Sequence, residues 1–499
     1  MNFKKHIYRL LVLTVVLSSC ADLEEKPHGI TNTISFYKTE ADANAALIYA
    51  YSVLPEVGYY SRMYYVVTEL PTENLTMKGD AGIGNTELDQ LRMTSTNTDI
   101  GNIWGYMYNA ILRANAVIAN VPQIAVMSEA SRNQVIGEGY FLRGLHYFNL
   151  VRMFGEVPVR TEPLTNVDQI PKAKSTIKEV YDLIISDLQK AEELMSAEEN
   201  LEGRANKIAA QALLSKVYLH LASSGESASP GYDFVTSPEE MYTNAKTYSG
   251  KVVNEQSVFG FTESLREIWD IEKYKVPSAV TEHIFDAAVD RNGAAEGNYS
   301  KLPNMFLPAI GFNMILDDGI NIGQGWNHFQ TEPAIYNFYA DNDKRKTELI
   351  VSSVKDDKGV ERTLNINDWS RPFSRKYIDP KRIGDASSAN SPVIRYSDIL
   401  LVYAEANGPT PEGYAAINRI RNRAGIGDLT TGLSVPDFRQ AVVEERAREL
   451  AFEGHRLFDL RRTNSVEKIL VDKYGKTITS GGYFFLIPQK ELDTNPLMK

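Results

Sequence analysis

Apolar residues recur at the helical spacing of three and four positions along most of the chain, which predicts amphipathic helices. The expected helices cover residues 40–53, 103–121, 128–154, 175–195, 205–222 and 238–253. Pro122 ends the second of these helices and Gly155 ends the third, because neither residue type favours continuing a helix. The helical pattern returns at residues 396–407, 411–424 and 435–454, and the apolar run 483–488 predicts a short final strand.

These helices come in twos with short polar joints between them. Their small and aromatic residues resemble degenerate tetratricopeptide repeats, as in residues 209–218 (AAQALLSKVY). No strict 34-residue period is visible, so a plain helical bundle remains an alternative to a repeat. The fold class we expect is mainly α, a tetratricopeptide-like helical-repeat scaffold with a large irregular insert.

That insert is predicted at residues 256–392, where helical periodicity is lost and Gly, Asn and Asp are frequent. Aromatic residues are scattered through it: Trp269, Tyr299, Phe306, Phe312, Trp326, Phe329 and Trp369. Loops this long are usually functional or disordered, and so many aromatic residues argue against disorder. We therefore expect ligand-binding loops and short strands here, between a helical region at 31–255 and a second at 393–499 that completes the same domain.

The N-terminus carries an export signal. Residues 1–19 combine the cations Lys4, Lys5 and Arg9 with an apolar stretch too short to span a bilayer, and Leu17-Ser18-Ser19-Cys20 resembles a bacterial lipobox. An ordinary secretory signal is the alternative. Lipidation of Cys20 would anchor the protein to a membrane through residues 20–30, a polar tether.

Composition narrows the range of partners. Removing the three signal cations takes the formal charge from −11 to −14, which argues against nucleic acid or anionic lipid as the main partner. Cys20 is the only cysteine, so a disulfide within the chain is excluded.

A search for catalytic or metal-binding motifs finds none that is complete. The seven histidines form no zinc-binding spacing, and no nucleophile elbow or phosphate-binding loop is present, so we expect no metal, cofactor or enzymatic activity. The dense charged segment 444–456 holds paired carboxylates that would suit a glycosidase. Each acid also has a basic neighbour at helical spacing, and we favour structural ion pairs because nothing completes a catalytic set.

The same segment, extended to residue 462, resembles the C-terminal signature of the SusD/RagB family of outer-membrane lipoproteins from Bacteroidetes. Five further motifs match that family in order: residues 138–151 with 154–155, 204–207, 392–401 with 403–406, 417–421 with 424–425, and 485–492 with 495–496. The resemblance covers essentially the whole mature chain.

The resemblance implies a function. Members of the family sit at the cell surface as lids on TonB-dependent (SusC-like) transporter barrels and capture oligosaccharides, or sometimes peptides, for import without catalysis. We therefore expect a lipid-anchored outer-membrane protein that binds a glycan, with a peptide ligand as the alternative within the family. A helical-repeat docking lipoprotein without a small ligand and a lipid-anchored glycoside hydrolase are the alternatives outside it.

The resemblance also indicates candidate binding residues. Trp326 lies where sugar-binding relatives place a stacking aromatic, and Tyr299 is a similar candidate; Asn327, beside Trp326, and Tyr60 complete the predicted site. Tryptophan and tyrosine faces suit the flat C–H faces of sugars, while amides bond their hydroxyls. Residues 74–79 lack the aromatic residues that starch-binding relatives carry there, which implies a ligand other than starch. Trp104, at helical spacing with Tyr108, is expected in the core.

Overall fold

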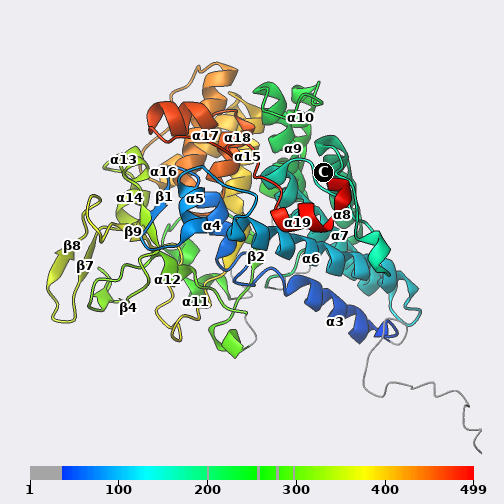
Figure 1. Ribbon diagram of the computed structural model, residues 1–499. Helices are drawn as coiled ribbons and strands as arrows, with labels where there is room; N and C mark the ends of the chain where they lie inside the picture. The colour runs from blue at the N-terminus through cyan, green and yellow to red at the C-terminus, as the bar shows by residue number, and fades with distance from the viewer. Residues whose placement is uncertain (1–35, 199–201, 255–258, 277–279, 296–297, 499) are drawn as a thin grey trace, which may run out of the picture.

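The computed structural model describes residues 36–198, 202–254, 259–276, 280–295 and 298–498. The predicted signal, Cys20 and the tether lie outside the described residues. The body is mainly helical, as predicted (Figure 1). Its N-terminal part contains α3 (Glu40–Tyr51), α4 (Met63–Glu69), α5 (Ile83–Asp89), α6 (Thr98–Asn120), α7 (Glu129–Phe154), α8 (Ile177–Leu194), α9 (Lys207–Glu226) and α10 (Pro238–Asn254).

Helices that follow one another along the chain pack together: α6 on α7, α7 on α8, α8 on α9, and α9 on α10. Local capping sets their ends. The Ser128 hydroxyl accepts a hydrogen bond from the Ser131 N–H at the start of α7, and Gly155 ends that helix with a φ of +72°. Thr176 and Glu179 form a capping box at the start of α8. The predicted boundaries are confirmed here to within a few residues.

The middle of the chain forms loops, short helices and short antiparallel strands, which confirms the predicted irregular insert. Its elements are α11 (Ile271–Tyr274), β2 (His283–Ala287), α12 (Leu302–Phe306), β3 (Met314–Ile315), β4 (Asn321–Gly323), β5 (Phe329–Thr331), α13 (Pro333–Phe338), α14 (Lys344–Leu349), β6 (Ile350–Val351), β7 (Ser353–Lys355), β8 (Glu361–Thr363) and β9 (Phe373–Ser374). The strands pair as β4-β3-β7-β8 and β6-β9. Strand β5 pairs with β1 (Leu75–Met77), which joins the insert to the N-terminal region.

The C-terminal part returns to the helical body. It contains β10 (Ser391–Arg395), which pairs with β2, and then α15 (Tyr396–Asn407), α16 (Pro411–Arg423), α17 (Val435–Glu449), α18 (Arg456–Arg462), the π-helical turn η5 (Glu467–Lys473) and α19 (Gln489–Thr494). The predicted strand at 483–488 is wrong, since this segment is irregular. Its apolar side chains pack on the helices instead: the Phe485 N–H donates to the Met153 carbonyl at 2.7 Å, and the Phe485 ring lies against Phe154.

Charged side chains fill part of the core where the insert meets the C-terminal helices. Arg395, which is 1 % exposed, bonds Glu282 at 2.6 Å, Glu449 at 3.0 Å and Glu453 at 2.9 Å. Burial alone would raise the pKa of Glu449, but the surrounding arginines lower it to about 2. Buried charges are costly unless they are paired, so each acid of this network needs its base. The charged segment is therefore part of the scaffold, as the sequence indicated.

Among the described helices, none is both long enough and apolar enough to cross a membrane.

Candidate functional site

The loop between β4 and β5 carries Trp326 and is fixed against α12. Three backbone N–H groups of the loop donate to carbonyls of that neighbouring segment: Gly325 to Pro308 at 3.0 Å, Trp326 to Asn304 at 2.7 Å, and Asn327 to Leu307 at 2.9 Å. The approach at Gly325 is so close that a Cβ there would lie 2.5 Å from the Leu307 oxygen. The position of Trp326 is therefore set by backbone contacts that only glycine permits.

Trp326 and Tyr299 flank a common cation. The Lys301 Nζ lies 5.5 Å from the centre of the Trp326 ring and 5.7 Å from the centre of the Tyr299 ring. Both rings are partly exposed. The backbone N–H of Lys301 donates to the Ser61 carbonyl at 3.2 Å, which fixes the backbone of this residue beside the N-terminal region. The structure thus brings two of the four predicted site residues together around one lysine.

Asn327 and Tyr60 are buried, so neither can contact a ligand in this structure. Asn327 is 2 % exposed, has a φ of 51° that asparagine tolerates, and donates through Nδ2 to the Trp369 carbonyl at 3.1 Å. Tyr60 is 2 % exposed, stacks on Tyr64, and accepts a hydrogen bond from Asn149 Nδ2 at 2.8 Å. The polar edge of a buried tyrosine needs such a partner, and Asn149 of α7 provides it. We therefore correct both assignments to supporting roles. The neighbouring tyrosines are buried in the same cluster: Tyr59, Tyr64 and Tyr65.

Trp369 is an aromatic residue that the sequence analysis did not assign to the site. It is 55 % exposed, and its carbonyl accepts hydrogen bonds from Asn327 and from Gln330 Nε2 at 3.3 Å. Its loop therefore lies directly beside the Trp326 loop. The exposure of Trp369 could have been predicted from the polar residues beside it, because residues 367–370 (NDWS) give a tryptophan no apolar neighbours to pack on. Trp104 is 5 % exposed, which confirms its expected place in the core.

A series of hydrogen-bonded polar side chains runs from the Trp326 loop to the start of α6. His328 Nε2 lies 2.6 Å from Asn85 Oδ1, and Asn85 Nδ2 donates to Asp99 at 2.6 Å. Burial, Arg62 and Lys78 lower the pKa of His328 to about 4, so its ring is neutral at pH 7 and donates the Nε2 proton to Asn85. Arg62 Nε is buried and has no hydrogen-bond partner among the described residues. These hydrogen bonds tie the Trp326 loop to the start of α6.

The carboxylates that would suit a glycosidase are engaged elsewhere. Glu445 and Glu449 are buried and bonded to arginines, with Arg345 Nη1 2.6 Å from Glu445 and Arg423 Nη2 2.7 Å from Glu449. No water or substrate can reach them without breaking this network. In the described part of the chain, no group of three or more His, Cys, Asp or Glu side chains could hold a metal ion.

Comparison with known proteins identifies the class to which this fold belongs. Residues 34–219 match a family model described as "Starch-binding associating with outer membrane", and residues 352–499 match the model of the SusD family. The chain belongs to the SusD family, as its motifs indicated.

Relatives extend the match over nearly the whole chain. SusD-like protein P2 of Formosa agariphila is 27 % identical over 486 residues, which cover 92 % of this chain and 90 % of the relative. A SusD-like protein of Bacteroides ovatus is 24 % identical over 392 residues, 74 % of this chain and 66 % of the relative.

Solved structures share the fold. A laminarin binding SusD-like protein superposes with a TM-score of 0.76 at 23 % identity and covers 92 % of this chain and 98 % of its own. Surface glycan-binding protein A from Bacteroides thetaiotaomicron, in complex with laminarihexaose, gives a TM-score of 0.72 at 20 % identity, covering 91 % and 97 %.

Proposed function

We propose that this protein captures an oligosaccharide or polysaccharide at the cell surface and delivers it to a TonB-dependent transporter barrel, without catalysing a reaction. The observation that carries the proposal is the partly exposed Trp326–Tyr299 pair around Lys301, mounted on a loop that backbone contacts hold in place. Aromatic faces bind the apolar faces of sugar rings, and a site held in place loses little entropy on binding. The laminarin-binding and laminarihexaose-bound proteins of the same fold support a glycan as the ligand.

Affinity gel electrophoresis tests the binding site. The full chain carrying Cys20→Ser, which cannot be lipidated, is run through gels containing laminarin, amylopectin, xylan, galactomannan or pectin. We expect one of these glycans to retard it, and Trp326→Ala to weaken binding roughly tenfold, equivalent to about 1.4 kcal/mol. Tyr49→Ala is the matched control, because Tyr49 is an aromatic side chain 59 % exposed on α3. Retention of full binding by Trp326→Ala would place the site elsewhere.

The anchor and the absence of catalysis are tested separately. Lipidation of Cys20 predicts that labelled fatty acid enters the wild-type chain and not the Cys20→Ser chain. Location at the cell surface predicts that the wild type is cleaved by protease added to whole cells.

No new reducing ends should appear when the protein is incubated with the glycan that it binds. Their appearance would show hydrolysis and contradict the proposal. Co-purification of a barrel protein from detergent-solubilised membranes tests the transporter partner.

A further inference from the structure

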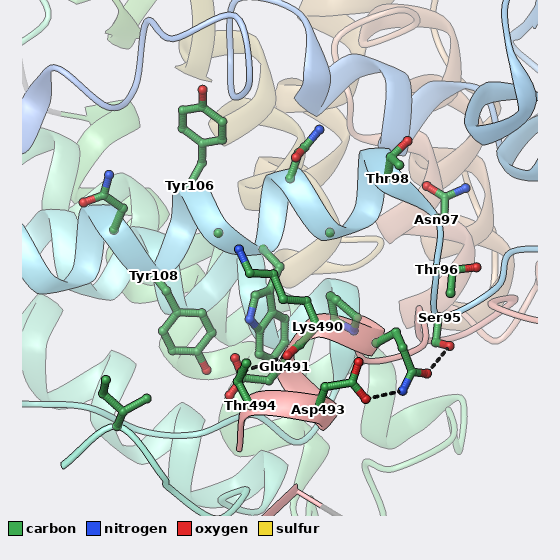
Figure 2. A pocket seen from close by; sticks show the side chains of 18 of the residues that line it. Ser95, Thr96, Asn97, Thr98, Tyr106, Tyr108, Lys490, Glu491, Asp493 and Thr494 are labelled. Atoms are coloured by element: carbon green, nitrogen blue, oxygen red, sulfur yellow. Dashed lines mark hydrogen bonds between the residues drawn. The ribbon is translucent and has the colours of Figure 1, made fainter. Parts of the chain in front are cut away.

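A groove of about 1170 Å³ lies between α6 and the C-terminal helix α19 (Figure 2). Neither Trp326 nor Tyr299 lines it. One wall is fixed to the start of α6 through Gln489, whose N–H donates to the Ser95 carbonyl at 2.7 Å and whose side chain bonds Ser95 Oγ and Asp493. The groove is therefore a built feature of the folded body, formed by segments almost 400 residues apart in sequence.

The floor of the groove is a stretch of α6 with weak helix formers. Asn102, Gly105 and Asn109 are exposed along it, and none of them is charged. A Cβ at Gly105 would meet nothing within 4 Å, and one at Gly101 would only touch Pro488 at 4.0 Å. Glycine destabilises a helix interior relative to alanine, and neither packing nor a positive φ requires it at position 105. The missing side chain leaves the amides of Asn102 and Asn109 open to the groove.

Two tyrosines of α6 complete the lining. Figure 2 shows the Tyr106 and Tyr108 rings on opposite sides of the helix. Tyr106 rests on Gly58, where a Cβ would lie 2.0 Å from the ring, and the Tyr108 hydroxyl donates to the Pro158 carbonyl at 2.8 Å. Both rings are partly exposed. They are held in fixed orientations and still offer apolar surface.

We propose that this groove is a second carbohydrate-binding site, which takes a segment of a neutral glycan. Uncharged amides bond hydroxyl groups, and the tyrosine rings contact the apolar faces of sugars. The charged side chains that also line the groove are of both signs, so they select no ion of one charge: Glu56, Arg160, Lys490, Glu491 and Asp493. Its volume exceeds the roughly 300–1,000 Å³ of ordinary small-molecule pockets, which suits a ligand of several sugar units. The proposal depends on these residues and does not require Trp326.

Filling the groove tests the proposal. A side chain at position 105 lies over the preceding helical turn, so Gly105→Gln covers Gly101 and Asn102, whereas Gly105→Ala adds only a methyl group. The Cys20→Ser chain and these variants are compared in gels containing laminarin, amylopectin, xylan, galactomannan or pectin. We expect Gly105→Gln to weaken binding of at least one glycan roughly tenfold, while Gly105→Ala stays within about twofold of the parent.

The outcomes separate the two sites. Loss of all binding in Trp326→Ala, with Gly105→Gln unchanged, overturns the groove proposal only; the reverse result overturns the Trp326 site only. No retardation by any of the five glycans overturns both. Melting temperatures show whether each variant is folded. If Gly105→Gln is not, Asn109→Ala, which removes one exposed amide, carries the test, and unchanged binding in that variant overturns the proposal.

Discussion

A single methyl group at Gly325 should displace the Trp326 loop without touching the exposed face of the site. In Gly325→Ala the new Cβ would lie 2.5 Å from the Leu307 oxygen and 2.7 Å from the Asn304 oxygen. Both atoms belong to the backbone at α12, which cannot rotate away as a flexible side chain could. Restoring an ordinary contact distance of 3.4 Å requires a shift of about 0.9 Å between loop and helix.

That shift has a cost for both stability and binding. It stretches the hydrogen bond from the Trp326 N–H to the Asn304 carbonyl, now 2.7 Å, and the bond from Gly325 to Pro308, now 3.0 Å. Overpacking of this kind typically costs about 1–3 kcal/mol of the free energy of unfolding. The indole moves with its backbone, so its position relative to Tyr299 changes by a similar distance, and we expect glycan binding to weaken roughly tenfold.

The assay is affinity gel electrophoresis of the Cys20→Ser chain, with urea unfolding of the same samples. Gly79→Ala is the matched control, because Gly79 lies in the nearby loop after β1 and a Cβ there meets nothing within 4 Å. It should bind like the parent. A folded Gly325→Ala protein that binds as tightly as Gly79→Ala would refute the claim that backbone contacts at α12 position Trp326.

The remaining predictions concern the buried charges. Arg395→Met should lower the free energy of unfolding in urea by about 3–5 kcal/mol, because it leaves buried acids without their base; a loss below about 1 kcal/mol would show that the network is dispensable. Stability should also fall as the pH drops from about 6.5 to 3. Burial lowers the pKa of His146 to about 3, so the unfolded chain takes up a proton near pH 6.5 that the folded chain refuses. Glu449, with a pKa of about 2 against an ordinary 4.5, adds a loss of the same sign below pH 4.5. A flat stability profile between pH 7 and 3 would contradict both assignments.

Helices with strong periodicity and clear end signals could be predicted from the sequence. Residues 128–154 gave α7 almost to the residue, because Ser128 caps its start and Gly155 its end. Helix α6 begins at Thr98 and not at the predicted residue 103, since its first turn is polar and is capped by Asn97. The apolar run 483–488 was mistaken for a strand. Its hydrophobicity serves to pack an irregular segment on α7, which no local pattern distinguishes from a strand.

The site was less predictable, because exposure depends on contacts distant in sequence. Tyr60 is covered because Asn149, 89 residues away, bonds its hydroxyl. Asn327 turns inward to hold the loop of Trp369, 42 residues further along. Neither partner can be identified from residues near the tyrosine or the asparagine. The resemblance to the family suggested Trp326 and Tyr299 as binding residues, and only the structure shows that Lys301 lies between them.

The buried charges explain how irregular loops can hold a rigid site. Lys376 of the insert bonds Glu453 at 2.6 Å, and Arg345 of α14 bonds Glu445 of α17 at 2.6 Å. A purely apolar contact would let the insert slide on the helices with little penalty, whereas moving a buried cation from its acid leaves both charges unpaired in a low-dielectric interior. The family signature at 444–462 therefore supports the proposed site indirectly: it fixes the insert to the scaffold, and the insert in turn holds Trp326 and Tyr299, the residues that we propose bind the glycan.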